Sequence, residues 1–348
     1  MIFAGDFYQY PPVGGTPLYR PILPYAEQTN SETTKRLGRL AWKTVNTVIT
    51  LKEQKRMADD PIYGAAVNRL RTRECTLDDV DLFNTRVIRT ANRPHGIDMG
   101  LDANYHATAI VRTNDLRQEI NLQRAKAIRP HPDTPESIVY SYAVDKTGTV
   151  LVDSDVRKEL LEMHLPARST SLPSVIPLYV GMPVILRSRN LCTELGISNG
   201  SQGILVKLYT ASCARGYTYC PCVIVQFPLS SVQLSGLPSS CFPIYPIPWR
   251  FTTLLRSGQQ MQITRHQLPI QPAFAVTGQS AQGKTLPSVL VNLAEGGFSA
   301  YVAASRARSS HNLYLTEPVT LQQLNKPLPQ ELIYELERLR ALEHNTMI

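Results

Sequence analysis

Short β-strand patterns separated by turn residues fill the middle of the chain, from residue 180 to residue 253. Val180–Leu186, Gly203–Leu208 and Cys222–Phe227 are each rich in the β-branched and aliphatic residues that favour strands. Asn199-Gly200 lies between the first two runs, and Asn-Gly is a strong signal for a tight turn. Because short strands are stable only when they pair, we expect residues 180–253 to form a small β-barrel.

An α/β pattern surrounds this β-rich insert. Ala107–Val111 has the residues of a buried strand, and a helix capped by Asn114 is expected to follow. Leu268–Thr277 and Leu286–Leu293 resume the pattern after the insert. Strands that alternate with helices are typical of a layered α/β domain. Other helices are expected at Ser31–Asn46, from Asp60-Pro61 to Arg71, after a Thr76/Asp79 capping box, and at Pro329–His344.

The chain of 348 residues carries a net charge of +8, from 36 Lys and Arg against 28 Asp and Glu. This excess of positive charge favours a polyanionic partner such as a nucleic acid. No apolar run approaches the ~20 residues that a membrane span needs, and the N-terminus has no signal-peptide pattern. We therefore expect an intracellular protein, nuclear or cytoplasmic, without a membrane partner.

The six cysteines predict reduced thiols rather than a metal site. They are Cys75, Cys192, Cys213, Cys220, Cys222 and Cys241. The Cys-x-Cys spacing at 220 and 222 differs from that of a zinc knuckle, and the nearest histidines are His164 and His266. We expect these cysteines on strands, in a reducing compartment, with no metal bound.

Gly278–Thr285 matches the P-loop expression G-x-x-x-x-G-K-[ST] letter for letter. A working P-loop lies between a strand and a helix, so that helix N–H groups point at the phosphates. Here Pro287 follows almost at once, and Ser288–Leu293 reads as a short β-strand. The sequence therefore argues against a P-loop at Lys284.

Gly5–Val13 reads as a strand end, a tight turn and a stiff Pro-Pro corner. A glutamine amide such as that of Gln9 can donate to a γ-phosphate oxygen and orient an attacking water. Pro11 and Pro12 make a rigid wall on which a base could stack.

Together with Leu51–Arg56 and Tyr301–Arg306, these segments resemble the motifs of the RecD/Pif-type helicases of superfamily 1B. Gly5–Val13 is similar to the family's Gly-Asp-Phe-x-Gln-Leu-Pro-Pro-Val, and Tyr301–Arg306 to its Tyr-Val-Ala-Leu-Ser-Arg. Thr277–Thr285 resembles the family's Thr-x-His-Lys-Ser-Gln-Gly-x-Thr, matching at Thr277, Gln282, Gly283 and Thr285. Gly236-Leu-Pro and Pro243–Pro248 resemble the helicase portion of fungal Helitron-type transposons.

The resemblance implies roles for individual residues. The implied catalytic residues are Gln9, Arg56 and Arg306, and the implied nucleotide contacts are these three with Gln282 and Gly283. Implied DNA contacts are Pro11, Pro12, Thr113, Asn114, Thr277, Gln279 and Ser280. Gln279 and Ser280 replace the family's His and Lys, which removes a cation expected near the DNA backbone and predicts a weaker grip.

The implied fold is an α/β, RecA-like P-loop-type helicase layer with an inserted SH3-like β-barrel. The expected parts are the end of a first RecA-like domain (1–58), a second RecA-like domain (59–179 and 254–320), the barrel (180–253) and a C-terminal helix (321–348). The implied function is ATP-dependent unwinding of DNA by movement on single strands, as in DNA repair, recombination and telomere maintenance, with ATP and Mg²⁺ as cofactors.

Three hypotheses about activity stay open at this point. The first is a fragment of a helicase, inactive alone because the Gly-rich loop and acidic pair that hold ATP and magnesium are expected in a missing N-terminal half. The second is a DNA-binding remnant or partner-dependent module without enzymatic activity. The third is a P-loop NTPase that uses Gly278–Thr285.

Overall fold

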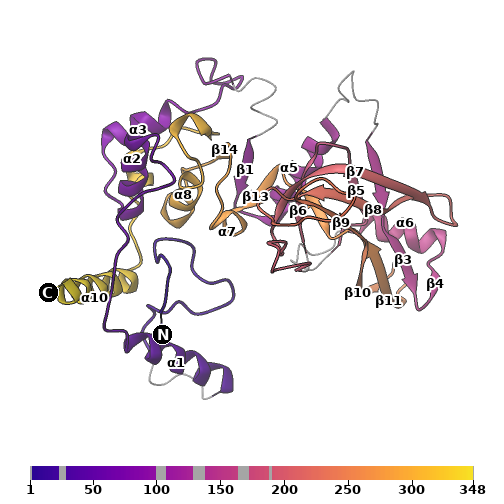
Figure 1. Cartoon of the computed structure of the whole chain (residues 1–348), viewed down its shortest axis with the longest axis horizontal. Helices are drawn as coiled ribbons and strands as arrows, with labels where there is room; N and C mark the ends of the chain where they lie inside the picture. Colours follow the sequence, from indigo (N-terminus) through magenta and orange to yellow (C-terminus); the bar gives the residue numbers. More distant parts are fainter. Residues whose placement is uncertain are drawn as a thin grey trace. The chain divides into compact units, whose positions relative to one another are not determined.

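The computed structural model describes residues 2–22, 29–98, 107–127, 138–163, 172–187 and 190–347. The chain divides into two compact units. Unit 1 comprises residues 1–112 and 277–348, and unit 2 comprises residues 113–276 (Figure 1).

Unit 1 is built around a small sheet with the strand order β13-β1-β14-β15. β1 pairs in parallel with β14, and β14 in parallel with β15, as an α/β layer requires. The strands are β1 (Thr108–Val111), β13 (Ala275–Thr277), β14 (Val289–Val291) and β15 (Leu313–Leu315). The boundary between the two units falls within β13, before Thr277. The helices are α1 (Asn30–Lys43), α2 (Pro61–Thr72), α3 (Leu77–Asn84), α7 (Gly278–Ala281), α8 (Gly297–Ala304), the 3₁₀ turn η1 (Ser310–Asn312), α9 (Leu321–Leu324) and α10 (Gln330–Met347).

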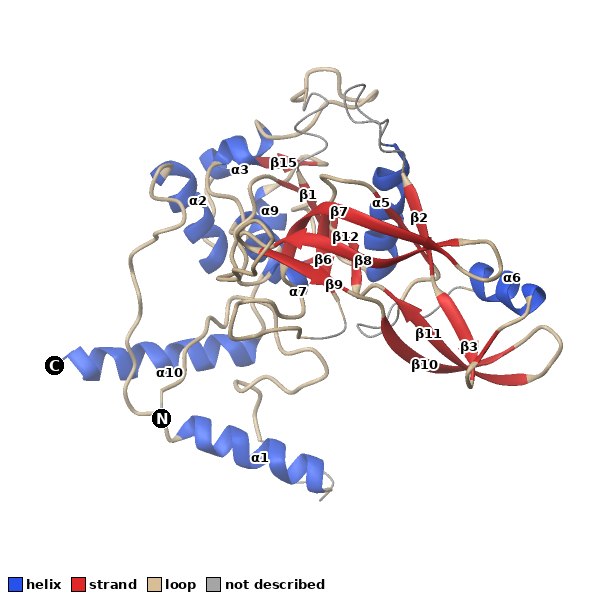
Figure 2. Cartoon of the chain, turned by 45° about the vertical axis from the view of Figure 1, so that its right-hand side comes forward, coloured by secondary structure: helices blue, strands red, loops and turns tan. Residues whose placement is uncertain are grey.

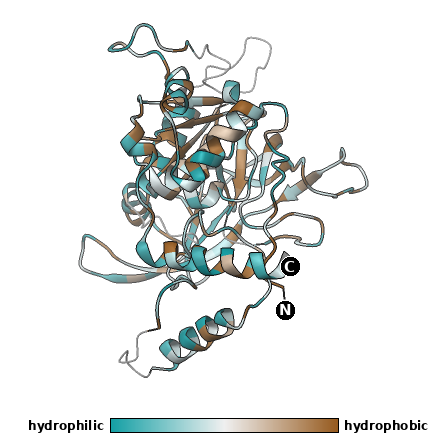
Figure 3. Cartoon of the chain, turned by 90° about the vertical axis from the view of Figure 1, so that its left-hand side faces the viewer, coloured by the Kyte–Doolittle hydropathy of each residue, from teal (hydrophilic) through white to brown (hydrophobic). Residues whose placement is uncertain are grey.

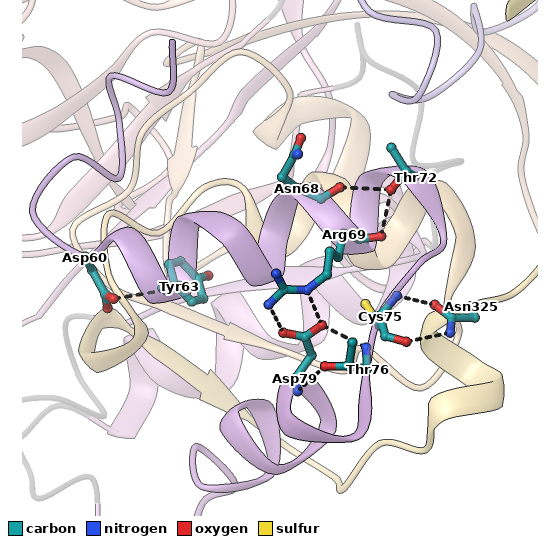
Figure 4. Close-up of polar contacts among 9 residues, drawn as sticks. All are labelled: Asp60, Tyr63, Asn68, Arg69, Thr72, Cys75, Thr76, Asp79 and Asn325. Carbon is teal, nitrogen blue, oxygen red and sulfur yellow. Dashed lines mark hydrogen bonds and ion pairs between the residues drawn. The ribbon is translucent and has the colours of Figure 1, made fainter. Parts of the chain in front are cut away.

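The helix starts in unit 1 follow the capping signals in the sequence. Asp60 accepts the backbone N–H of Tyr63 and begins α2, and Thr76 with Asp79 forms the expected capping box of α3 (Figure 4). Arg69 of α2 forms a bidentate pair with Asp79 at 2.7 and 2.6 Å, which joins the two helices.

The C-terminal helix α10 is amphipathic, as expected, and its hydrophilic and hydrophobic residues alternate along the helix that ends at the C mark in Figure 3. Leu332 is fully buried, and so is the Glu335 carboxylate. Glu335 accepts the indole N–H of Trp42 at 2.6 Å, an ion pair from Lys43 and two bonds from Arg338. These bonds fix the last turn of α1 on α10.

Unit 2 is mainly β-structure, with α5 and α6 beside its strands (Figure 2). One sheet has the order β12-β6-β7-β8-β9, a second β10-β11-β3-β4, and β2 pairs with β5. The helices are α5 (Asn114–Ala127) and α6 (Ser154–Glu162). The strands are β2 (Val139–Tyr142), β3 (Val144–Thr147), β4 (Val150–Leu151), β5 (Val175–Leu178), β6 (Pro183–Leu186), β7 (Gln202–Ser212), β8 (Thr218–Gln226), β9 (Cys241–Ile244), β10 (Ile247–Leu254), β11 (Gln260–Gln267) and β12 (Ile270–Pro272).

The segment 180–253 holds β6 to β9 and nearly all of β10, in agreement with the strand patterns of the sequence. Its strands nevertheless divide between two sheets that also take strands from outside the segment, namely β3, β4, β11 and β12. The compact unit begins at Thr113 and so reaches well beyond the expected insert. The SH3-like character of the insert stays a prediction.

Three smaller expectations can be compared with the structure. α5 is capped by Thr113 rather than Asn114, because the backbone N–H of Leu116 donates to Thr113 Oγ1 at 3.2 Å. The six cysteines are free thiols, and the described part of the chain contains no group of three His, Cys, Asp or Glu residues suited to a metal ion. Among the described helices, none combines the length and the apolar composition of a membrane span.

Candidate functional site

The turn that contains Asp6 anchors the Gly5–Val13 segment to two helices of unit 1. Asp6 Oδ1 accepts the backbone N–H of Tyr8 at 3.1 Å, which closes the turn, and it pairs with Arg71 Nη2 of α2 at 3.2 Å. Asp6 Oδ2 accepts the hydroxyl of Tyr301 of α8 at 3.0 Å. Asp6 therefore joins the N-terminal motif to the motif around Arg306, although 295 residues separate Asp6 from Tyr301.

Two tyrosines hold the same segment in place. Tyr8 is buried, and the Arg71 guanidinium lies 4.4 Å above its ring. Tyr10 packs against the start of α7 so closely that a Cβ on Gly278 would lie 2.3 Å from its hydroxyl. A Cβ at position 278 would force the Tyr10 ring to move, so packing against Tyr10 explains this glycine without a phosphate.

Gln9, Pro11 and Pro12 stay accessible on this anchored segment. The Gln9 side chain is half-buried, and its Nε2 lies 3.5 Å from Asp6 Oδ2, a long contact that holds the amide only weakly. Pro11 and Pro12 are exposed. The amide and the proline surface are therefore both available to a ligand.

Arg56 and Arg306 converge on the end of α8. Arg56 donates from Nε to Thr285 Oγ1 at 3.0 Å and from Nη1 to the carbonyl of Ser305 at 2.6 Å. Arg306 is 2% exposed and donates to the carbonyls of Val302 at 2.8 Å and Lys284 at 3.0 Å. Its Nη2 donates to Ser305 Oγ at 2.6 Å. All of these acceptors are neutral oxygens.

The two arginines share a strained electrostatic environment. Burial, and secondly the charge of Arg56, lower the pKa of Arg306 to about 10. Burial also lowers the pKa of Arg56. Groups whose pKa values are shifted by burial and by neighbouring charge are concentrated at functional sites, which makes this pair a candidate for binding an anion. In this conformation, Arg306 reaches a ligand only if it releases carbonyl oxygens.

The segment 277–285 does not have the geometry of a P-loop. α7 ends at Ala281, before Gly283, and the chain continues without a helix to β14. The strand predicted within 286–293 is thus confirmed with narrower bounds, as Val289–Val291. A P-loop needs a helix that begins near Lys284, and this segment has none.

The other residues implied in this segment occupy different positions. Thr277 is buried and caps α7, with Ser280 as its partner at 3.0 Å between the two hydroxyls. Gln279, Gln282 and Gly283 are exposed, and Gly283 has a left-handed φ of +80°. Of the residues implied in this segment, Gln279, Gln282 and Gly283 can meet a strand or a nucleotide without moving, and Ser280 can do so in part.

Thr113 and Asn114 belong to unit 2 and are exposed at the amino end of α5. The Asn114 amide oxygen accepts a bond from Arg117 Nη1 at 2.7 Å. Asn121, on the same helix, exchanges two hydrogen bonds with the backbone of Ala275 and has a structural part.

Sequence reasoning did not assign roles to Asp6, Arg71 and Tyr301, which organise the site. Asp6 and Tyr301 lie inside the two matched motifs, so the motifs themselves carried the signal. Arg71 had no comparable signal, because only the folded chain brings it to Asp6.

No protein-family model matches the chain. The chain is 26% identical over 332 residues to the ATP-dependent DNA helicase PIF6 of Trypanosoma brucei brucei, covering 91% of this chain and 36% of that protein. It is 24% identical over 351 residues to the ATP-dependent DNA helicase PIF1 of Xenopus laevis, covering 100% of this chain and 45% of that protein. The chain thus spans less than half the length of these relatives.

Solved structures show the same fold. The Pif1 helicase of Candida albicans matches with a TM-score of 0.58 and 22% identity, over 96% of this chain and 67% of that chain. A Bacteroides Pif1 helicase in complex with ADP-AlF3 and single-stranded DNA matches with a TM-score of 0.60 and 18% identity, over 98% and 67%. The α/β layer with its parallel sheet is therefore the RecA-like fold of these helicases.

Proposed function

Because the chain belongs to the RecD/Pif-type family of superfamily 1B helicases, we propose that it supplies the phosphate-sensing and strand-binding part of an ATP-dependent DNA helicase. ATP and Mg²⁺ are the cofactors of the whole motor in this proposal, and single-stranded DNA is its track. The chain alone hydrolyses no ATP, and it works with a P-loop-bearing half.

The convergence of Arg56 and Arg306 on Ser305 is the observation that supports this proposal most directly. Hydrogen bonds from a guanidinium to a phosphate oxygen are roughly twice as strong as those to neutral acceptors. A γ-phosphate that approaches this pair therefore competes well with the carbonyl of Ser305. Arg56 is the more accessible of the two, and it is the first contact in the proposal.

Gln9 is the third phosphate sensor in this proposal. Its amide can donate to a phosphate oxygen and accept from a water, which no charged side chain can do. The weak contact with Asp6 leaves the amide free to turn. Because Asp6 also holds Tyr301, a shift of Gln9 on nucleotide binding is transmitted to α8.

DNA contacts are proposed on the exposed parts of the implied set, namely Pro11, Pro12, Thr113, Asn114 and Gln279, with Ser280 and the capping residue Thr277 in support. A base can stack on the proline surface, and the polar groups can bond phosphate or sugar oxygens. The net charge of +8 adds attraction that does not depend on sequence.

The proposal is tested by titrating the purified chain with a fluorescent ATP analogue and, separately, with a single-stranded oligonucleotide. We expect weak nucleotide binding that is lost in Arg56→Gln and unchanged in Lys284→Ala. Loss of binding in Lys284→Ala alone would favour the P-loop hypothesis. Oligonucleotide binding without any nucleotide binding would favour the hypothesis of a DNA-binding module.

A further inference from the structure

Unit 2 contains two arginines that the motifs do not single out. Arg117 lies in the first turns of α5, a helix of 14 residues, and Arg187 directly follows β6. α5 packs on β5 and β12, and β12 is the neighbour of β6, so the topology brings both arginines to one side of unit 2.

Arg117 is buried with an incomplete set of partners. Its side chain is 3% exposed, and Nη1 donates to the Asn114 amide oxygen at the start of the helix. Its Nε is buried and has no hydrogen-bond partner. Burying a charged group in this way is costly unless an acceptor completes it.

The positive charge of Arg187 increases the cost of burying Arg117. Burial, and secondly the positive charge of Arg187, lower the pKa of Arg117 to about 10, and Asp115 offsets only part of this effect. Burial also lowers the pKa of Arg187. Arg187 is only half-buried, but the two guanidinium groups have the same charge, and an anion beside them would offset their repulsion.

The amino end of α5 adds to the same positive potential. The helix dipole places partial positive charge there, and the Thr113 hydroxyl caps the N–H of Leu116. Helix amino ends with a nearby arginine are common phosphate sites, because N–H groups and guanidinium groups donate to the same oxygens.

We propose that Arg117, Arg187 and the amino end of α5 form a phosphate-binding site. The net charge of +8 favours a DNA strand as the source of this phosphate, and in that respect the inference rests on the proposed function. Free phosphate is the alternative source of the same chemistry. In this site Arg187 is the more exposed of the two guanidinium groups, and Arg117 is held at the start of α5 by its bond to the Asn114 amide oxygen.

The test compares wild type with Arg187→Gln, with the charge-preserving Arg187→Lys, and with Arg215→Gln, which removes an exposed charge in the β7–β8 turn of the same unit. The first readout is the melting temperature with and without inorganic phosphate. The second is the affinity for a single-stranded oligonucleotide across a salt series. Arg187 is chosen because it is only half-buried, so its replacement is compatible with folding.

In wild type we expect phosphate at ten times its Kd to raise the melting temperature by about 4 °C. Arg187→Gln should lose this rise without lowering the melting temperature in the absence of phosphate, because repulsion of Arg117 is relieved. Its salt slope on single strands should become shallower by roughly 0.7. Arg187→Lys and Arg215→Gln should keep the phosphate effect.

The outcomes separate this inference from the proposed function. Unchanged phosphate stabilisation and an unchanged salt slope in Arg187→Gln would overturn the site while leaving DNA binding in place. Phosphate stabilisation that is lost in Arg187→Gln, in a chain that binds no oligonucleotide at any salt concentration, would support a free-phosphate site and contradict the helicase proposal.

Discussion

Arg265 of unit 2 and Arg306 of unit 1 are both almost completely buried, at 0% and 2% exposure, but their partners differ in kind. Arg265 forms two bonds of 2.8 Å with the carboxylate of Asp145. Arg306 bonds only to carbonyl and hydroxyl oxygens. A neutralised pair holds strands together, whereas a buried charge with neutral partners remains able to receive an anion.

The backbone around the two arginines supports this distinction. Arg265 and Asp145 face each other across paired strands β11 and β3, so neither can move alone. Arg306 follows the last turn of α8 and lies against the loop that ends at Thr285. An arginine at a helix end beside a loop can change partners at a lower cost than one between two strands.

The largest expected effect is at the paired arginine. Asp145→Asn leaves the charge of Arg265 buried without its counter-ion and should lower the free energy of unfolding by about 3–5 kcal/mol. Urea denaturation measures this through Trp249, because the chain has two tryptophans and only Trp249 belongs to unit 2. The matched control is Glu162→Gln, since its pair with Arg256 is largely exposed and should contribute at most about 1 kcal/mol. Equal losses of unfolding free energy in Asp145→Asn and Glu162→Gln would mean that the buried pair stabilises the unit no more than the exposed pair does.

Arg306→Met should have a smaller effect on stability. The change leaves the carbonyls of Val302 and Lys284 without this donor, but it also removes a costly buried charge, so we expect a loss of about 2 kcal/mol. Trp42 fluorescence reports the unfolding of unit 1, and Arg308→Met at an exposed position is the control. A loss as large as that of Asp145→Asn would mean that Arg306 is a structural residue like Arg265.

Asp6→Asn tests the connection between the two motifs of unit 1. The change weakens the acceptor for Arg71 and Tyr301, both partly exposed contacts, and should cost about 1 kcal/mol. Burial and Asp6 together raise the pKa of Tyr301 to about 12. Titration of tyrosine absorbance should therefore show one group that ionises at lower pH in Asp6→Asn. An unchanged titration would place Tyr301 outside the influence of Asp6.

The smallest expected effect concerns the loop 277–285. Ser280→Lys introduces the cation that the motif resemblance implies at this position, and it should steepen the salt dependence of single-strand binding by roughly 0.7 per added phosphate contact. Gln322→Lys, at an exposed position of α9 outside this loop, is the control for added charge alone. If the affinity at low salt is the same in Ser280→Lys and wild type, the loop does not contact DNA.

Local signals in the sequence predicted much of the fold. The Thr76/Asp79 capping box, the Asp60-Pro61 helix start and the strands between residues 180 and 253 are confirmed, because each depends on a few neighbouring residues. The extent of unit 2 could not be predicted in the same way. β3 has four residues and β4 only two, so neither carries a clear strand pattern. β3 pairs with β11 and β4 pairs with β3, and the pairing of β3 is decided by residues far away in the sequence.

The candidate site could be predicted only as a set of residues. The motifs identified Gln9 and Arg306, but they contain no information on the bonds that these side chains make. That Arg306 is held by Val302 and Lys284 follows from packing around α8. The Asp6–Tyr301 bond likewise depends on a fold that joins the two ends of the chain.

ATP hydrolysis by the purified chain, with and without single-stranded DNA, tests the central claim most directly. We predict turnover at the background rate in both conditions, because the proposal gives Gln9, Arg56 and Arg306 a phosphate-sensing role only, and Gly278–Thr285 lacks the helix that a P-loop needs to hold a phosphate. DNA-stimulated turnover that disappears in Lys284→Ala would contradict the account and establish a working P-loop in this segment.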